Sequence, residues 1–379
     1  MTIDDLFMKK EKQQKIRVLA AISGGVDSAV AAALLIKQGF DVTGAFMRCY
    51  SDTVSSQPCW IEDRREALRV CAKLGIKLLV FDFEKEYRQS VVSYLFREYR
   101  VGRTPNPDVM CNKFVKFPLL LKQAKKLGFE YVATGHYARL RREIPKSPPA
   151  GDLPKGDNIQ LFCAKDENKD QTYFLHQLMQ KELRSVLFPI GEYIKPEVRA
   201  MARKFGLPVA EREESMGICF VGEVPIRQFL LKKIKPRPGK IVLANKTVVG
   251  AHTGLPFYTI GQRVGVGGGT APFYVVAKDK KKNQLIVAHE NSPFLYKKEC
   301  TVKNINWISG TPKLPLSCLV RLRHRQPLQK AVVCHSERSE AKSRNPLTIR
   351  FAKSQRAITP GQFAVFYRKG ECLGGGEIL

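Results

Sequence analysis

The chain has 379 residues, 44% of them hydrophobic and 26% charged, which is the composition of a soluble globular protein with two or three domains. Lysine and arginine number 64 against 35 aspartate and glutamate residues, so the formal net charge is +29. Such a surplus favours a polyanionic partner, because cations that neutralise phosphates release condensed counterions.

Two further observations exclude classes of protein. The longest apolar run, Ala29 to Ile36, is far shorter than the ~20 residues that cross a bilayer, and the N-terminal residues lack the apolar core of a signal peptide. We therefore expect a cytoplasmic protein with no membrane partner. The ten cysteines are scattered, with no CxxC pair and no Cys/His cluster. This spacing predicts neither a disulfide framework nor a metal site with protein ligands.

The first part of the chain alternates strand-like and helix-like segments. Residues 15–22 are a nearly continuous apolar run, typical of a strand buried on both faces of a parallel sheet. A helix capped by Asp27 is expected to follow it and to end at Gly39. The later elements predicted are a strand at 41–47, a helix at 62–75, a strand at 76–83, helices at 84–100 and 114–127, and a strand at 130–136. This order predicts a doubly wound parallel sheet with helices on both faces.

The local composition changes in the second half of the chain. Residues 142–158 read as an exposed loop, and 169–183 and 195–206 as helices that extend the first domain. After about residue 217, glycines become dense and short β-branched runs appear, which predicts small β-rich modules. The expected domains are an α/β domain at 1–216, a central β-rich domain at 217–295 and a C-terminal β-barrel at 296–379. The hydrophilic tract at 334–346 is expected to be an inserted hairpin loop.

Two local patterns in the C-terminal part lead to specific expectations. Arg321, Arg323 and Arg325 alternate, so on a strand all three would point to one face and add to a basic surface. The run Gly374–Gly376 does not precede a helix-like segment, so a hairpin turn is a better interpretation than a phosphate loop.

The first strand leads into Ser23-Gly24-Gly25-Val26-Asp27-Ser28 and then a helix. Free N–H groups and the dipole at a helix N-terminus form an anion site, and the glycines allow a close approach. The sequence fits neither a Walker A loop nor a dinucleotide fingerprint. It matches the pyrophosphate-cradling (PP) loop of the ATP pyrophosphatases, which split ATP between the α and β phosphates; a simple Gly-Gly turn is the alternative.

Two cysteines lie in unusual surroundings. Cys111 follows Asn106-Pro107-Asp108 at the start of a predicted helix, where the helix N-terminus favours a thiolate. Asp108 is placed to accept or deliver a proton. Cys219 lies between Gly217 and Gly222. An inert buried thiol remains the alternative for each, and spacing alone does not bring the two together.

Several motifs together resemble one family, the bacterial tRNA-specific 2-thiouridylases of the MnmA type. The match extends almost from end to end of the chain. The segments that carry it are SGGVDS (23–28), NPDVMCN (106–112), ATGHYAR (133–139), KDQTYFL (169–175), GICFVGE (217–223), HTGLPFYTIGQRVGVG (252–267) and AITPGQFAVFY (357–367).

The resemblance implies a role for each matching residue. The residues implied to bind ATP are Ala21, Ile22, Ser23, Gly24, Gly25, Val26, Asp27, Ser28, Met47 and Gly135. Those implied to face the target base are Asn106, Pro107 and Asp108, and those implied to contact tRNA are Lys169, Asp170, Gln171, Arg323 and His324. Cys219 would carry a persulfide, Cys111 would be the nucleophile, and the two would form a transient disulfide.

The implied reaction is thiolation of the wobble uridine. ATP, with Mg²⁺, would adenylate the C2 oxygen, and persulfide sulfur would then replace it. Whether the persulfide attacks directly or Cys111 first releases sulfide stays open. The implied partners are the anticodon stem-loop of tRNA and a persulfide-bearing sulfur donor, such as a cysteine desulfurase or a sulfur-relay protein.

Two other functions remain as alternatives. One is a different PP-loop ATP pyrophosphatase, such as an amide-forming ligase, which needs neither a cysteine pair nor a basic RNA surface. The other is a non-catalytic RNA-binding relative, which would bind tRNA in a salt-sensitive way without releasing pyrophosphate.

Overall fold

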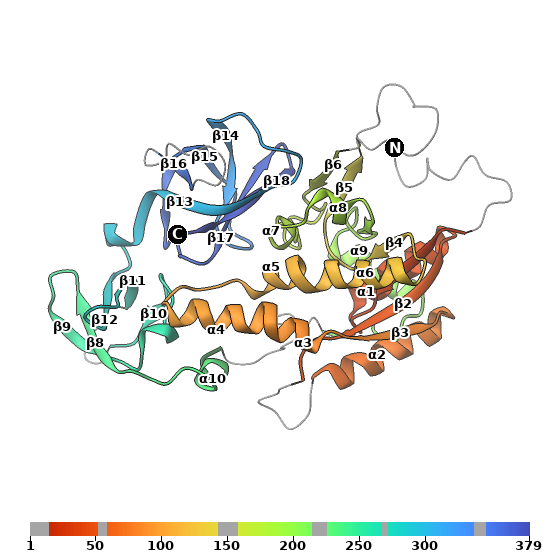
Figure 1. Cartoon of the computed structure of the whole chain (residues 1–379), viewed down its shortest axis with the longest axis horizontal. Helices are drawn as coiled ribbons and strands as arrows, with labels where there is room; N and C mark the ends of the chain where they lie inside the picture. The colour runs from red at the N-terminus through yellow and green to blue at the C-terminus, as the bar shows by residue number, and fades with distance from the viewer. Residues whose placement is uncertain (1–14, 52–58, 143–157, 214–225, 267–271, 337–345) are drawn as a thin grey trace.

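In this computed structural model, the described residues are 15–51, 59–142, 158–213, 226–266, 272–336 and 346–379. They form an α/β domain followed by two β-rich modules, so the predicted fold class is confirmed (Figure 1). Among the described helices, none is long and apolar enough to cross a membrane. The expected Cys219 site and the central parts of the 142–158 and 334–346 segments fall outside the described residues.

The first domain is built on a parallel sheet of five strands. Their order is β3 (Leu78–Asp82), β2 (Asp41–Arg48), β1 (Arg17–Ala21), β4 (Tyr131–Ala133) and β7 (Val186–Leu187). Val18 and Ala20 of β1 enter one hydrophobic core and Leu19 enters the other, as expected for a strand buried on both faces. The two-residue edge strand β7 was not predicted, because it is too short to leave a pattern in the sequence.

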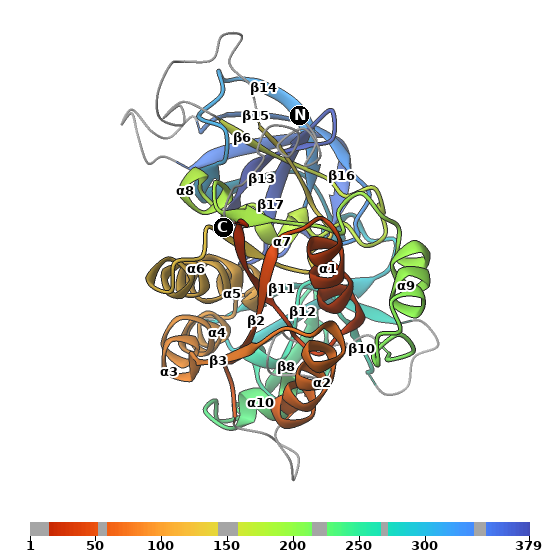
Figure 2. The ribbon, with the colours of Figure 1, turned by 90° about the vertical axis from the view of Figure 1, so that its right-hand side faces the viewer.

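Helices cover both faces of this sheet (Figure 2). On one face lie α1 (Val26–Lys37), α2 (Cys59–Leu74) and α9 (Lys195–Lys204). On the other face lie two longer helical stretches, each interrupted by one π-helical segment. The first stretch is α3 (Glu84–Tyr87), η2 (Arg88–Val92) and α4 (Ser93–Arg100); the second is α5 (Pro107–Cys111), η3 (Asn112–Lys116) and α6 (Phe117–Lys126).

The long helix expected over 169–183 was wrong. The structure instead has two short helices, α7 (Thr172–Leu175) and α8 (Gln180–Leu183), separated by an extended Met179. The break frees the Gln180 side chain to pair with the backbone of Ile159 and to donate to the Ile308 carbonyl at 2.8 Å. These long-range hydrogen bonds outweigh the local helical preference of the segment.

The C-terminal module is a closed six-stranded barrel. The strands, in spatial order, are β13 (Tyr296–Trp307), β16 (Leu347–Arg356), β15 (Gln329–His335), β14 (Leu316–Arg321), β17 (Phe363–Arg368) and β18 (Glu371–Ile378). Pairing of β13 with β18 closes it. Residues 374–376 lie inside β18, so the predicted turn was wrong. A Cβ on Gly374 would lie 1.9 Å from the Asn306 carbonyl oxygen, which explains why a glycine is needed where β18 pairs with β13.

The central module contains a smaller sheet at lower left in Figure 1. Its strands are, in spatial order, β10 (Arg263–Val264), β11 (Phe273–Asp279), β12 (Gln284–His289), β8 (Gly239–Leu243) and β9 (Val248–His252). Three short helices complete the two modules: α10 (Ile226–Leu231), η4 (Leu255–Phe257) and η5 (Pro293–Leu295).

The first domain extends the barrel sheet. Strands β5 (Arg139–Arg142) and β6 (Ile159–Phe162) pair as a hairpin, and β6 pairs with β18 through Leu161 and Phe162. The segment at 142–158 is therefore the connection of a hairpin that docks the barrel, which the sequence did not predict. The tract at 334–346 does connect the paired strands β15 and β16, as expected.

A buried ion pair crosses the same boundary. Nη1 of Arg321 lies 3.0 Å from Oδ2 of Asp170, with side chains 10% and 0% exposed. Strand β14 ends at Arg321, while Arg323 and Arg325 lie exposed in the turn beyond it, with Arg325 at a φ of 62°. The three arginines therefore do not share one strand face, and that expectation was wrong: the strand is too short and its last arginine points inward.

We predict that replacing Arg321 with Met will lower the free energy of unfolding by about 3–5 kcal/mol, because Asp170 would be left as an uncompensated buried charge. Urea unfolding followed by circular dichroism measures the change. The control is Arg203→Met, since Arg203 pairs with Glu211 at side-chain exposures of 59% and 73%, where solvent screens the pair and its loss should change stability little. Equal losses in the two variants would contradict the prediction.

Candidate active site

The loop between β1 and α1 lies at the carboxyl edge of the parallel sheet, where ligands bind in this architecture. Gly24 has a φ of +82°, and a Cβ there would lie 2.5 Å from the carbonyl of Asp63, so glycine is required. The Ser23 amide donates to Oγ of Ser28 at 3.1 Å, and that hydroxyl donates to the Gly25 carbonyl at 3.0 Å. The two serines thus hold the loop in shape.

Helix α1 begins without a side-chain cap, because its N-cap residue is Gly25. Asp27 lies in the first turn instead, so the capping expected of it was wrong. Its Oδ1 accepts hydrogen bonds from the hydroxyl of Tyr137 at 2.8 Å and from Nζ of Lys195 at 2.7 Å. Backbone N–H groups in the first turn, left without a side-chain cap, together with the helix dipole, form a site suited to an anion.

A second cationic side chain, that of Arg212, contacts the loop. Nη1 of Arg212 donates to the Gly24 carbonyl at 2.7 Å, and Nη2 donates to Oδ1 of Asp63 on α2 at 2.8 Å. Neither Lys195 nor Arg212 was singled out in the sequence. Each is far along the chain from the loop, and a lone basic residue beside a helix or turn carries no recognisable pattern.

The other two residues expected at the nucleotide also lie at this edge. Met47 is the penultimate residue of β2 and is 7% exposed. Gly135 follows β4, and a Cβ there would lie 2.6 Å from the backbone nitrogen of Ser28. The strand end therefore packs directly over the first turn of α1.

His136 is held between apolar rings and hydrogen-bonding groups. Its Nδ1 lies 2.7 Å from Oγ1 of Thr134, and its ring packs against Phe117 and Phe188. Burial, reinforced by the nearby Lys116, holds the pKa of His136 well below its usual range. The ring is therefore neutral at physiological pH.

The segment bearing Cys111 starts the second helical stretch. Oδ1 of Asn106 accepts a hydrogen bond from the Val109 amide at 3.2 Å as an N-cap, Pro107 is at N1, and Asp108 is in the first turn. Cys111 is fully buried in the core that also contains Met47, immediately before the π-helical segment η3. π-Bulges of this kind occur often at functional sites.

The barrel reaches this segment. Nδ2 of Asn106 lies 3.3 Å from Oε1 of Gln362, and Nε2 of Gln362 donates to the Thr104 carbonyl at 3.0 Å. The structure does not test how near Cys111 lies to Cys219, because residues 214–225 are outside the described residues.

The residues expected to contact tRNA gather where the first domain meets the barrel. Asp170 is buried in its pair with Arg321, and Oε1 of Gln171 accepts the Tyr137 amide at 2.9 Å. The His324 ring packs on Phe174 at 4.6 Å between centroids. The segments 169–171 and 323–324 are thus brought together, with Arg323 exposed.

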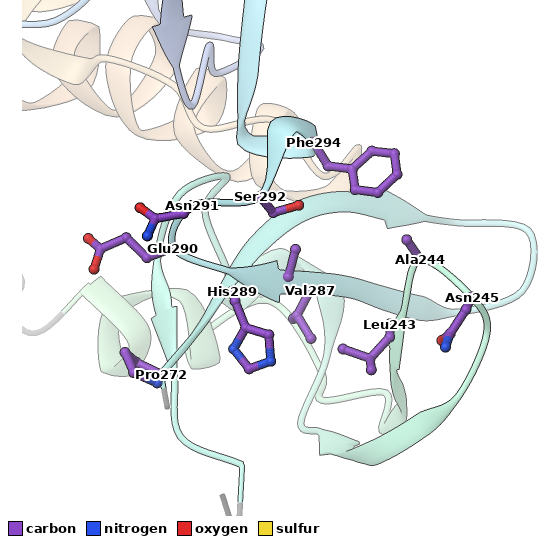
Figure 3. Close-up of a pocket in the computed structure, with 11 residues that line it drawn as sticks. Leu243, Ala244, Asn245, Pro272, Val287, His289, Glu290, Asn291, Ser292 and Phe294 are labelled. Atoms are coloured by element: carbon purple, nitrogen blue, oxygen red, sulfur yellow. The ribbon is translucent and has the colours of Figure 1, made fainter. Parts of the chain in front are cut away.

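Two hollows lie outside the loop region. A groove of about 1740 Å³ runs between the helices around Tyr94 and Lys113 and the barrel strands around Trp307. Another, of about 560 Å³, lies in the central module between the turn at Asn245 and the ring of Phe294 (Figure 3). None of the expected site residues that the structure describes lines either hollow. Within the described ranges there is also no group of three or more His, Cys, Asp or Glu residues placed to hold a metal.

Comparison with known proteins identifies the family. The family model described as "tRNA methyl transferase HUP domain" matches residues 16–223, and models described as a "tRNA methyl transferase PRC-barrel domain" and an "Aminomethyltransferase beta-barrel domain" match 227–289 and 297–378. The tRNA-specific 2-thiouridylase MnmA of Halalkalibacterium halodurans is 42% identical over 376 residues, covering 98% of this chain and 96% of that protein. The chain belongs to the tRNA-specific 2-thiouridylase family.

Other members of the 2-thiouridylase family are equally similar. The MnmA proteins of Bacillus subtilis and Listeria innocua are 42% and 44% identical, covering 97% and 96% of this chain and 96% and 94% of theirs. Among solved structures, a 4-thiouridine synthetase–RNA complex with bound ATP is 18% identical over 57% of this chain and 50% of that one. Its TM-score of 0.36 is too low to support an argument.

We predict that Gly135→Ala will lower the affinity for ATP at least tenfold, because the added Cβ would press on the Ser28 amide in the first turn of α1. Isothermal titration of the purified variant with ATP measures this. Gly265→Ala is the matched control, since its Cβ would meet no atom within 4 Å. Unchanged ATP affinity in Gly135→Ala would contradict the prediction.

A second prediction concerns pH. Burial, together with Arg325, Arg321 and Lys169, lowers the pKa of His324 from 6.5 to about 4. Between about pH 4 and about pH 6.5, His324 is protonated in the unfolded chain but neutral in the folded one. The stability that comes from the neutral ring is therefore complete above about pH 6.5 and is lost as the pH falls towards 4.

The variant His324→Phe should therefore lose less stability than the wild type between about pH 7 and about pH 4.5, because the phenyl ring keeps the contact with Phe174 and cannot be protonated. Urea midpoints at the two pH values measure the difference. His335→Phe, at an exposed position on β15, should follow the wild type. A wild-type pH dependence in His324→Phe would refute the assignment.

Proposed function

We propose that the chain is an ATP-dependent tRNA-uridine 2-sulfurtransferase, which adenylates C2–O of the wobble uridine and replaces that oxygen with sulfur. Membership of the 2-thiouridylase family supports this, since the curated relatives match 96% and more of the chain. The observation that supports the mechanism is that Cys111 lies in the same hydrophobic core as Met47, near the carboxyl end of β2, the strand that pairs with β1 beside the phosphate loop.

The first step uses the loop as an anion site. The residues proposed to hold ATP are Ala21–Ser28, Met47 and Gly135. Attack of the uridine C2 oxygen on the α-phosphorus would release pyrophosphate and leave an AMP ester, converting a poor leaving group into a good one. Magnesium would arrive bound to the phosphates.

The second step transfers sulfur. Cys219 would carry a persulfide whose outer sulfur attacks C2 and expels AMP, and Cys111 would then attack the inner sulfur. The products are 2-thiouridine and a Cys111–Cys219 disulfide, which an external thiol reduces before the next cycle. In the other order, Cys111 first releases sulfide, which attacks C2. Asp108, in the first turn of α5, is proposed to transfer the proton.

The tRNA would lie along the boundary of the first domain and the barrel. Asn106, Pro107 and Asp108 are proposed to face the extruded base, which is cheaper to unstack from an anticodon loop than from a duplex. Lys169 and Gln171, with Arg323 and His324, are proposed to contact the RNA beside it. Asp170 is proposed to act through its pair with Arg321, since its side chain is buried.

The remaining parts of the proposal follow from this reaction. A persulfide-bearing protein, such as a cysteine desulfurase or a sulfur-relay protein, would load Cys219, and the site of action would be the cytoplasm, where tRNA is modified. We also propose domain limits at 1–216, 217–295 and 296–379, close to those of the three family models.

The experiment that tests the function incubates the protein with ATP, Mg²⁺, a sulfur donor and unmodified tRNA. Thiolated tRNA is detected by its retardation on a mercury-containing gel. We predict that Cys219→Ser and Cys111→Ser lose at least 100-fold in thiolation rate while binding ATP normally, because each removes a reacting sulfur and neither residue belongs to the phosphate loop. Cys334→Ser, in barrel strand β15, is the control and should retain full activity.

The outcomes separate the candidate functions. Thiolation by Cys219→Ser would overturn the persulfide role of that residue. Pyrophosphate release that depends on an amine and not on tRNA would favour an amide-forming ligase. Salt-sensitive tRNA binding without pyrophosphate release would favour a non-catalytic RNA-binding protein.

A further inference from the structure

The phosphate loop contains two peptide units flanked by glycine at the point where the loop passes into α1. They join Gly24 to Gly25 and Gly25 to Val26, immediately before α1. Glycine rotates about φ and ψ more freely than any other residue, so such a unit can flip with little steric resistance. A flip would exchange the positions of its N–H and C=O groups, and a carbonyl pointing into an anion site would repel the anion.

The second of these units is held by the first turn of α1. The Gly25 carbonyl accepts hydrogen bonds from Oγ of Ser28 at 3.0 Å and from the Ala29 amide at 3.3 Å. Because a trans peptide is planar, its C=O and N–H point in opposite directions. Fixing the Gly25 carbonyl therefore also fixes the direction of the Val26 N–H.

The first unit is held from outside the loop, by Arg212. Nη1 of Arg212 donates to the Gly24 carbonyl at 2.7 Å, and the same planarity then directs the Gly25 N–H to the opposite side. The guanidinium is itself held, since Nη2 donates to Oδ1 of Asp63 on α2 at 2.8 Å. Arg199 on α9 donates to the backbone carbonyl of Arg212 at 3.2 Å and so fixes the backbone from which the guanidinium extends.

We infer that Arg212 is a positioning residue for the pyrophosphate part of ATP: it locks the Gly24–Gly25 peptide so that the Gly25 N–H faces the phosphates. The inference rests on the proposed function in taking ATP as the ligand. An arginine suits this role because its fork of donors serves the carbonyl and the carboxylate at once. A lysine would offer one ammonium group to the same two acceptors and hold them less firmly.

A role that was only structural makes a different prediction. If Arg212 merely attached the chain around residue 212 to the domain, its loss would weaken all nucleotides alike and lower stability. If it orients a phosphate-binding N–H, its loss weakens ligands that carry the pyrophosphate group and spares AMP. Inorganic pyrophosphate, ATP and AMP are therefore the three probes.

The experiment titrates the full-length protein with each probe by isothermal calorimetry, in the absence of tRNA. We expect Arg212→Ala to bind pyrophosphate and ATP about 10- to 100-fold more weakly, the range for one hydrogen bond to a charged group, with AMP within about twofold of wild type. Arg212→Lys should fall between the two. Arg203→Ala, in the exposed pair with Glu211 beside Arg212 in the chain, is the matched control and should bind all three as the wild type does.

Wild-type affinity of Arg212→Ala for pyrophosphate would overturn the inference and leave the proposed function intact. An equal loss for AMP and pyrophosphate would also overturn it, in favour of the structural role. If Arg212→Ala does not fold, the same comparison in Arg212→Lys decides. A wild-type protein that bound neither ATP nor pyrophosphate would overturn the proposed function and this inference together.

Discussion

The open N-terminus of α1 is the constraint on which the rest of the first domain depends. A helix that starts at a glycine leaves amide groups without intrahelical partners and a positive potential at the edge of the sheet. The neighbouring side chains are arranged so that they do not neutralise this potential. Asp27, the one acidic side chain in that turn, is engaged by Tyr137 and Lys195. Gly135 gives β4 room to end directly above the same turn.

The meeting of the first domain and the barrel organises the other half of the site. Arg321 reaches from the end of β14 to the buried Asp170, and the hydroxyl of Tyr173 donates to the Phe363 carbonyl at 3.0 Å. Gln362 reaches from the barrel to the Asn106 segment. The barrel is therefore more than a separate module, because it contributes to the position of the helix that carries Cys111.

The sequence predicted the fold class and the parallel strands of the first domain well, because buried strands and the helices between them leave strong local patterns. It predicted the loop between β1 and α1 for the same reason: glycines, hydroxyls and a helix start are adjacent in the chain. The failures have a common cause. The break at Met179, the inward turn of Arg321 and the glycines inside β18 are each decided by partners more than 60 residues away in the chain.

The candidate site shows the same difference between features set by local sequence and features set by distant partners. Residues in a contiguous motif could be named from the sequence, whereas Lys195 and Arg212 could not, since each acts on a segment far from its own. Gln362 lies in the matching segment 357–367, but its contact with Asn106 could not be foreseen for the same reason. Only the folded chain places them at the loop and at the cysteine helix. The assignments of ATP, base and tRNA contacts rest on the family resemblance and remain predictions.

Strand β6 of the first domain is hydrogen-bonded to β18 of the barrel. Two segments that match different family models are therefore hydrogen-bonded to each other through their backbones. A rotation of the barrel against the first domain would have to break backbone hydrogen bonds, not only slide one surface over another. An RNA bound across the boundary between the first domain and the barrel would therefore contact two parts joined by backbone hydrogen bonds. The spacing of the β-strands would then set the distance between the β1–α1 loop and the barrel surface.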